Sequence, residues 1–350
     1  MWIIKNYINI FRNILKFIIY FFFFKIVIYS IFFLKLKKQN ILYTNHFGFG
    51  DFLFFCVHIR KRINSNNKIF CFSKLQYEIA NFFFEQKYIA KSFILAPRFI
   101  SDSHLGYNFL DKQKIFIPTN PKRFAPDNRK VPISDFYKGT RSSIKFIKLK
   151  INARKISTRI VDVLKKPTIS LFIKNFSKYK NNHINFQVRQ TRDLNKIQRI
   201  IYFLNEKNFN VIILGTEKDN FIQLFSKKIY NNKEILKNIF LFKDLSDNYS
   251  VSDQAYVALN SIGYIGSASG AMGFFGLLNK KTILIDAVFY YADKYWKDFI
   301  FLYKKIYNKK NKTFKKFIWK KYYDPSTYKI VEVNFKDIKN ALVKKILNNY

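Results

Sequence analysis

Short apolar runs alternate with helical patterns between Thr168 and Ile285, and this alternation limits the folds that the chain can adopt. Strands that alternate with short helices are typical of βαβ units, in which the strands are parallel and the helices cover the sheet. The same alternation follows Lys38 in the first half. The sequence therefore predicts an α/β protein with two Rossmann-like domains that face each other across a cleft. Expected strands are residues 41–44, 68–72, 93–95, 115–117, 169–173, 211–214, 239–242, 264–265 and 282–285, and expected helices are residues 52–63, 77–84, 144–164, 194–207, 252–260, 271–278 and 337–347.

Pro167 provides the expected domain boundary, because a proline that follows a polar helix end is typical of a linker. We expect an N-terminal domain over residues 39–166 and a C-terminal domain over residues 167–335. A C-terminal helix within residues 336–350 is expected to pack back across the junction. Five of the seven prolines lie between Pro97 and Pro132, which indicates a loop-rich insertion.

Residues 1–38 form a hydrophobic segment in which an apolar run, residues 17–34, is interrupted only by Lys25 and flanked by basic residues. No small-residue cleavage site follows, so the segment does not indicate a secretory signal. The run is short for a membrane span, and a central Lys costs roughly 2.5–3.5 kcal/mol on insertion. Three alternatives stay open, namely an N-terminal hydrophobic helix in the membrane plane, a span, or a buried helix. The first two predict association with a membrane.

The composition indicates which classes of partner and which redox compartment to expect. Lys and Arg number 63 against 22 Asp and Glu, which gives a net charge of +41. The excess is spread along the chain with no basic block or zinc-finger spacing, so it does not indicate nucleic acid, although it favours phosphorylated donors, acidic glycans or an anionic membrane surface. Cys56 and Cys71 lie in apolar surroundings and indicate a reducing compartment without a disulfide framework. Four histidines with no Cys/His cluster predict no metal site.

The first candidate site is the turn around Gly48, Gly50 and Asp51, between a strand-like run and an apolar stretch of helical length. Asp51 is the only acidic residue before Glu78. Strand-to-helix turns lie at the carboxyl edge of open α/β sheets, where such folds place their chemistry. Asp51 is therefore a candidate site residue, and the alternative is that it only begins or caps the helix.

The second candidate site is the sequence Gly-Ser-Ala-Ser-Gly at residues 266–270, between a short strand and a helix. Glycines allow a ligand to approach the backbone, hydroxyl groups add donors, and a helix N-terminus attracts an anion. This arrangement suits a diphosphate, although many such turns bind nothing. Guanidinium groups at Arg189 and Arg192 match phosphate oxygens and could neutralise a departing nucleoside diphosphate, or they could be solvated surface residues. The predicted donor-binding residues are Gly266, Ser267, Ser269, Gly270, Arg189 and Arg192.

These motifs resemble the heptosyltransferase-like glycosyltransferases and related bacterial surface-polysaccharide glycosyltransferases. The likeness covers roughly residues 41–56 and 168–286, including Gly50-Asp51, Arg192-Asp193 and the stretch around residues 263–286, with a weaker match near residues 333–347. The resemblance implies a GT-B fold of two Rossmann-like domains, with the donor bound mainly by the second. Ala268 and Gly273 stand where the family's donor loop has Asp and His, so a heptose donor is not implied.

The resemblance implies that Asp51 is the general base of an inverting, metal-independent sugar transfer, with His46 as an accessory or substitute base. Gly215 and Glu217 follow a strand, and Glu217 could hold a ribose hydroxyl or could be an ordinary exposed acid. The expected partners are a nucleotide-sugar donor, a surface-polysaccharide (lipopolysaccharide) or lipid-linked glycan acceptor, and the inner-membrane surface, with no nucleic acid and no cofactor. The expected location is the cytoplasmic face of the bacterial inner membrane.

Two rival interpretations use other residues. Asn45-His46 and Asp51 also fit the N-H-x4-D pattern of membrane glycerolipid acyltransferases, with His46 as base and Arg141 on the acceptor phosphate. Lys138-Gly-Thr-Arg141-Ser resembles the Glu-Gly-Thr-Arg-Ser block of the acyltransferases but carries Lys138 in place of Glu, and the acyltransferase interpretation gives residues 168–286 no purpose. The other rival interpretation is a basic protein that only binds an acidic glycan or nucleic acid. Its only support is the net positive charge.

Overall fold

The structure, a computed structural model, consists of two compact units, Met1–Asp135 and Phe136–Tyr350, each described separately. It describes positions 15, 18 and 63 and residues 40–42, 49–60, 67–71, 73–91, 133–175, 190–215, 221–223, 225–226, 236–247, 249–288, 298–318, 323–324 and 326–349. The predicted strands at residues 93–95 and 115–117 lie outside these residues, as does nearly all of the hydrophobic segment. No helix within the described ranges is long and apolar enough to cross a membrane.

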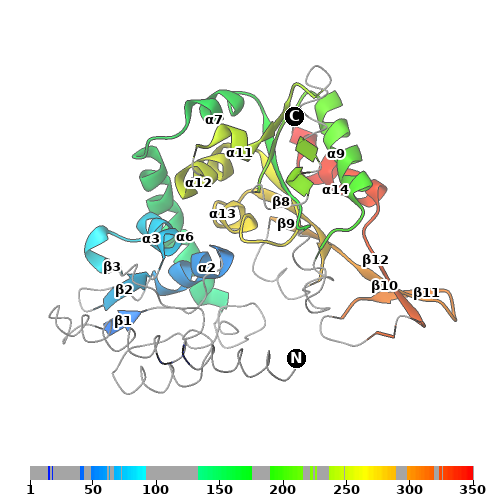
Figure 1. Ribbon diagram of the computed structural model, residues 1–350, viewed down its shortest axis with the longest axis horizontal. Coiled ribbons are helices and arrows are strands. Elements are labelled where there is room, and N and C mark those ends of the chain that lie inside the picture. Colours follow the sequence, from blue (N-terminus) through cyan, green and yellow to red (C-terminus); the bar gives the residue numbers. More distant parts are fainter. Residues whose placement is uncertain are drawn as a thin grey trace. The chain divides into compact units, whose positions relative to one another are not determined.

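The first unit contains a three-stranded parallel sheet (Figure 1). Its strands are β1 (Asn40–Leu42), β2 (Asn67–Cys71) and β3 (Ile89–Lys91), in that order, and its helices are α2 (Phe49–Ile59), α3 (Lys74–Phe83) and the 3-10 turn η2 (Gln86–Tyr88). Helix α2 begins at Phe49, before the predicted start at residue 52, so Gly50 and Asp51 lie in its first turn. Cys56 and Cys71 are free and buried, and burial raises the pKa of both thiols.

The second unit is built on a six-stranded sheet with the order β6-β5-β4-β7-β8-β9, in which all neighbouring strands are parallel. Counted from β4, this is the order 3-2-1-4-5-6 of the doubly wound nucleotide-binding fold. The predicted α/β class is therefore confirmed for this unit. The strands are β4 (Thr168–Phe172), β5 (Asn210–Ile213), β6 (Ile239–Leu241), β7 (Gly263–Gly266), β8 (Lys281–Ala287) and β9 (Phe299–Tyr303).

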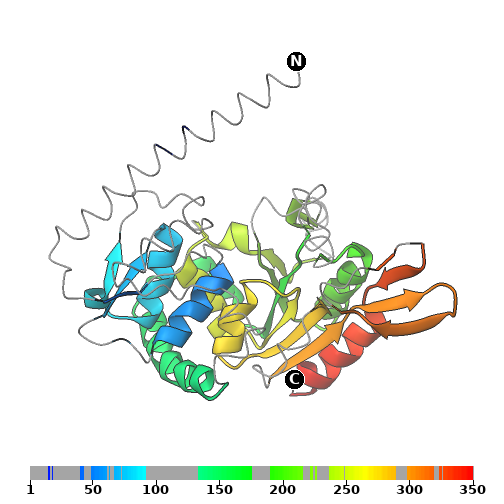
Figure 2. The ribbon, with the colours of Figure 1, turned by 90° about the horizontal axis from the view of Figure 1, so that it is seen from below.

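Helices cover both faces of this sheet (Figures 1 and 2). Alternate strand residues such as Leu171 and Ile265 share one buried core with α9 (Leu194–Glu206) and α14 (Phe335–Lys345). Tyr264, the neighbour of Ile265, points to the opposite face, where its ring lies 4.8 Å from that of Phe275 in α13. The helices of that second face are α12 (Val251–Asn260) and α13 (Met272–Leu277), and the remaining short helices are α11 (Phe242–Leu245) and η6 (Leu347–Asn349).

Two helices, α6 (Ile133–Asn152) and α7 (Thr158–Val163), replace the single helix predicted over residues 144–164, so that prediction is wrong. The break has a hydrogen-bonded cause. Ser157 Oγ donates to the carbonyl of Leu245 at 2.6 Å, and the N–H of Ser157 donates to Asp253 Oδ1 at 3.2 Å. These bonds tie the break to the unit of the six-stranded sheet, which begins at Phe136, in the first turn of α6.

A small antiparallel sheet, which the sequence analysis does not predict, follows β9. Its order is β11-β10-β12, with β10 (Lys305–Asn308) central between β11 (Thr313–Lys316) and β12 (Tyr328–Val331). One face packs on a cluster of Val288, Ile306 and Phe317.

Candidate functional site

The turn after β7 lies at the switch point of the six-stranded sheet. Strands β4 and β7 are neighbours there, and the chain runs outward from them in opposite directions, to β5 and to β8. In doubly wound sheets the crevice at the carboxyl ends of two such strands is where ligands bind. The sequence thus places residues 266–270 at the position where this fold offers a ligand site.

Gly266 allows the β7 turn to pass close to β4. A Cβ atom at this position would overlap the carbonyl oxygen of Phe172 and lie 2.9 Å from its carbonyl carbon. The next residue continues the contact, since the N–H of Ser267 donates to the Phe172 carbonyl at 2.8 Å. A side chain at residue 266 would therefore push the candidate turn away from β4.

We expect Gly266→Ala to lower the free energy of unfolding of the second unit by about 2–4 kcal/mol, because the clash is with backbone that cannot rotate away. Denaturant unfolding followed by circular dichroism measures this loss. Gly263→Ala on the same strand is the matched control. There an added Cβ would lie 2.7 Å from Ile346 Cδ1, a movable side-chain end, and 2.9 Å from the Lys281 carbonyl oxygen, a slighter overlap than the one with Phe172, so the expected loss is smaller. An equal loss at both positions would contradict the argument.

The two serines of the turn have different surroundings. Ser267 is buried, and its Oγ accepts a hydrogen bond from the N–H of Lys174 at 3.0 Å and lies 3.3 Å from Thr191 Oγ1. Ser269 is only half-buried, and its Oγ lies 3.5 Å from the hydroxyl of Tyr264. Burial raises the pKa of Tyr264, so its hydroxyl stays protonated and donates to the Ser267 carbonyl at 3.1 Å. Ser267 therefore fixes the turn, and Ser269 is the serine within reach of a ligand.

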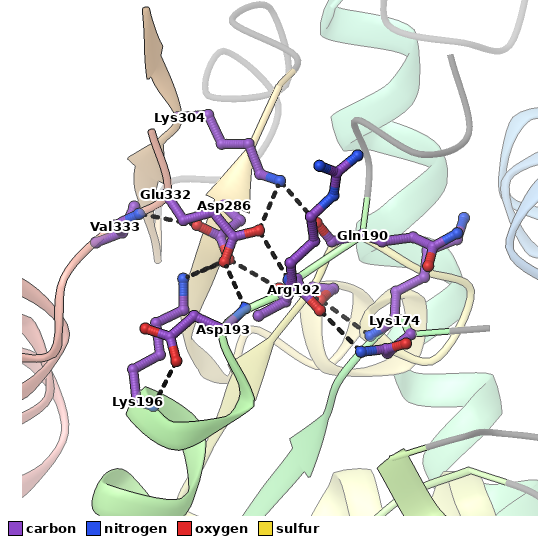
Figure 3. A network of polar contacts seen from close by, with 12 residues as sticks. Lys174, Gln190, Arg192, Asp193, Lys196, Asp286, Lys304, Glu332 and Val333 are labelled. Carbon is purple, nitrogen blue, oxygen red and sulfur yellow. Dashed lines mark hydrogen bonds and ion pairs between the residues drawn. The ribbon is translucent and has the colours of Figure 1, made fainter. Parts of the chain in front are cut away.

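A buried group of four charged side chains, the ion quartet, lies beside this turn (Figure 3). Lys196 Nζ is 2.8 Å from Asp286 Oδ2 and 2.9 Å from Glu332 Oε2, and Lys304 Nζ is 3.2 Å from Glu332 Oε1. The side chains of Lys196, Lys304 and Asp286 are at most 3% exposed, so these ion pairs are removed from water. Two ammonium groups balance two carboxylates.

The ion quartet holds the backbone of residues 190–193. Lys304 Nζ donates to the carbonyl of Gln190 at 2.6 Å, and Thr191 Oγ1 donates to Asp286 Oδ2 at 2.8 Å. The N–H groups of Arg192 and Asp193 donate to the two oxygens of Glu332 at 2.8 and 3.1 Å. Thr191 also reaches Ser267, so the ion quartet is connected to the β7 turn through one side chain.

The charges in the ion quartet shift its pKa values. Burial would raise the pKa of Glu332, but Lys304, Lys196 and the N–H of Arg192 together outweigh burial and lower it to about 2. Burial lowers the pKa of Lys304, against the opposing effect of Glu332 and Asp286. Asp286 has a φ of +53°, in the left-handed region, and lies where β8 shifts register against β9 between Leu284 and Ala287. This bulge presents the carboxylate to Lys196, Thr191 and the N–H of Val333, which donates to it at 2.9 Å.

The structure describes only some of the predicted site residues. Gly215, just beyond β5, has a φ of +133°, which favours glycine. Arg192 is exposed, and its N–H binds Glu332. Gly50 and the backbone of Asp51 lie in α2 of the first unit. His46, Gly48, Arg189 and Glu217 lie outside the described residues.

The ion quartet is what the sequence analysis missed. Asp286 gives the one usable signal, because it is a single acid at the carboxyl end of an apolar strand. Lys196 and Lys304 are inconspicuous in a chain with this many lysines, and no local pattern marks Glu332. Within the described part of the chain, no group of three His, Cys, Asp or Glu side chains is arranged to hold a metal ion.

Comparison with known proteins identifies the fold. No protein-family model and no curated protein sequence matches this chain. Among solved structures, E. coli ADP-heptose lps heptosyltransferase II is similar over 89% of this chain and 99% of its own length, with a TM-score of 0.50 and 10% sequence identity. E. coli heptosyltransferase WaaC with ADP-2-deoxy-2-fluoro heptose is similar over 75% of this chain and 92% of its own, with a TM-score of 0.44 and 10% identity. The chain thus shares the α/β fold of GT-B heptosyltransferase structures, as its motifs predict.

Proposed function

We propose that this protein is a glycosyltransferase that transfers a sugar from a nucleotide-sugar donor to a surface-polysaccharide or lipid-linked glycan acceptor. The observation that carries the proposal is the 3-2-1-4-5-6 sheet, with a Gly/Ser turn at its switch point. Sheets of this order bind nucleotides at that crevice. The fold shared with heptosyltransferase II agrees with this class of reaction.

The donor diphosphate would bind at the half-buried part of the β7 turn, which comprises Ala268, Ser269 and Gly270. These residues offer backbone N–H groups and one hydroxyl, and Arg189 and Arg192 would add guanidinium donors. Gly215 follows β5, on the far side of β4 from β7, and would leave room for the nucleotide, and Glu217 would hold a ribose hydroxyl. With Ala268 and Gly273 in place of the heptosyltransferase Asp and His, we do not propose heptose as the sugar.

Asp51 would remove the proton from the acceptor hydroxyl, with His46 as an accessory or substitute base. The acceptor oxygen then forms a bond to the anomeric carbon as the bond from that carbon to the diphosphate breaks on the opposite face. The configuration inverts, and the negative charge leaves on the nucleoside diphosphate. The guanidinium groups and the turn N–H groups would stabilise that charge without a metal ion or a cofactor. The hydrophobic segment would keep the protein at the cytoplasmic face of the inner membrane, near a lipid-linked acceptor.

Nucleoside diphosphates are expected to raise the melting temperature of the detergent-solubilised protein. A ligand at 100 times its Kd adds about 2.7 kcal/mol, which corresponds to roughly 5–10 °C for a domain of this size. Ser269→Asp should abolish the rise, because it places a carboxylate where the diphosphate binds. A thermal-shift panel of nucleotides and nucleotide sugars measures both effects.

Thr158→Asp is the matched control for charge. Thr158 is exposed at the start of α7, next to Ser157, which bonds to Leu245 beyond the edge strand β6, and β6 is three strands away from β7 in the sheet. It should leave the nucleotide shift intact. An unchanged shift in Ser269→Asp would refute this placement of the donor. Stabilisation by an acyl-coenzyme A and by no nucleotide would instead favour the acyltransferase.

A further inference from the structure

The antiparallel sheet of the second unit carries basic and aromatic side chains on one face, here called the ribbon face. Tyr307 on β10 pairs with Phe314 on β11 and with Lys329 on β12. Two positions along the strands, Lys305 on β10 pairs with Lys316 on β11. Because residues two apart on a strand share a face, these five side chains lie together. Figures 1 and 2 show the three strands extending beyond the six-stranded sheet.

The ribbon face is the outward one. Ile306 and Asn308, which alternate with the ribbon-face residues on β10, are buried, and Ile306 packs with Val288 and Phe317. Lys305, Lys316 and Lys329 are exposed, and all four residues of β11 are exposed. Core packing therefore uses one side of this sheet and leaves the other in solvent.

Charge on this sheet is of one sign. No Asp or Glu occurs on the three strands or in the hairpin between β10 and β11. The hairpin between β10 and β11 adds exposed lysines next to the ribbon face, namely Lys309, Lys310 and Lys312. Such a concentration of ammonium groups attracts an anionic partner.

Exposed apolar side chains among these lysines indicate which anionic partner fits. Phe314 is 60% exposed, with its ring 5.0 Å from that of Tyr307, and Ile318, just beyond β11, is 52% exposed. A free phosphate or a sugar chain gains little from an exposed isoleucine. A bilayer interface accepts both groups, because lysines bind lipid phosphates while aromatic and aliphatic side chains enter the region beneath the head groups.

We propose that the ribbon face docks on an anionic lipid bilayer. This contact is separate from the hydrophobic segment and does not depend on the proposed sugar transfer. It would hold the second unit, with its candidate donor turn, against the membrane surface. Each lysine near such a surface contributes roughly fivefold to binding, so three lysines contribute on the order of 100-fold.

A local fluorescent reporter tests the proposal in the full chain. Cys56 and Cys71 are the only cysteines and are both buried, so Lys310→Cys in the β10–β11 hairpin can be labelled selectively with an environment-sensitive dye. The label should shift to the blue with vesicles of phosphatidylcholine and phosphatidylglycerol, and much less with phosphatidylcholine alone. Half-molar salt should weaken the shift.

Charge-reversal variants identify the surface. Lys305→Glu, Lys316→Glu and Lys329→Glu together should raise the lipid concentration for half-maximal shift by at least roughly 100-fold, because each change removes an attraction and adds a repulsion. Phe314→Ser, which keeps the charge, should reduce the blue shift. The matched control reverses three exposed lysines elsewhere in the second unit, Lys155, Lys166 and Lys207, and should leave the shift unchanged.

Three results would overturn the proposal. The first is an equal dye response to neutral and anionic vesicles, and the second is an equal loss in the two triple variants. The third is displacement from anionic vesicles by single-stranded RNA at concentrations below that of the lipid, which would identify a polynucleotide surface.

Discussion

Lys196→Met is expected to lower the free energy of unfolding of the second unit by about 3–5 kcal/mol. The substitution keeps most of the side-chain volume and removes the ammonium group that pairs with both Asp286 and Glu332. Glu332 keeps Lys304, but Asp286 keeps only neutral donors among its described contacts, Thr191 and the N–H of Val333. A carboxylate that is 1% exposed then loses the ammonium group that it contacts and keeps only the longer-range attraction of Lys304, and that is the main cost.

Denaturant unfolding of the full chain in detergent measures this loss. Lys165→Met is the matched control, because Lys165 also pairs with an acid, Asp162 at 2.7 Å, but both side chains are at least 66% exposed. Exposed pairs contribute about 0–1 kcal/mol, so the control should change little. The double variant Lys196→Met with Asp286→Asn should recover part of the loss, since it removes the stranded charge. A small effect of Lys196→Met alone would show that the ion quartet does not stabilise the fold.

Acid titration gives a second measurement on the same group. The carboxyl of Glu332 has an ordinary pKa of 4.5, lowered to about 2 in the folded protein. Its contribution is therefore complete above pH 4.5 and is lost as the pH falls toward 2. Glu332→Gln should flatten the slope of stability against pH in that window. An unchanged slope would contradict the lowered pKa.

Asp51→Asn is expected to reduce the rate of sugar transfer by roughly 10²–10⁴-fold while donor binding persists, because the amide cannot accept the acceptor's proton. Initial rates with the nucleotide sugar selected by thermal shift give kcat, and the thermal shift itself reports donor affinity. A kcat effect without loss of the shift separates a base from a residue that only supports the fold. Unchanged stability would agree with that assignment.

Asp162→Asn is the control for loss of one carboxylate, since Asp162 is exposed on α7 and paired only with a surface lysine among its described contacts. It should transfer sugar at the normal rate. A full rate in Asp51→Asn, together with complete loss in His46→Ala, would assign proton removal to His46. Loss of donor binding in Asp51→Asn would instead give Asp51 a structural role.

Strands β4, β5, β7 and β8 were predictable to within two residues, because they are buried on both faces and read as continuous apolar runs. The sheet of β10, β11 and β12 was not predictable from the sequence. Its outward face is rich in lysine, and β11 is exposed throughout, so no apolar run or clean alternation marks those strands.

The candidate site was also only partly predictable from the sequence. Residues 266–270 were predictable because a glycine-spaced turn between a strand and a helix is a local pattern. The ion quartet was not, since Lys196 lies 90 residues from Asp286 and 136 from Glu332, and no local pattern connects them. The single helix predicted at residues 144–164 failed for a related reason, because the break at Ser157 is fixed by Leu245 and Asp253.

The position of α14 has a consequence for biosynthesis. Ile338, Leu342 and Ile346 complete the same core as β4, β5 and α9, although they follow β4 by more than 160 residues. During translation, α9 therefore covers only part of the apolar side of the central strands until the turns of α14 have left the ribosome. A core that forms from residues so far apart in the sequence forms slowly and leaves apolar surface exposed meanwhile. The nascent chain should therefore depend on a chaperone that shields this apolar surface.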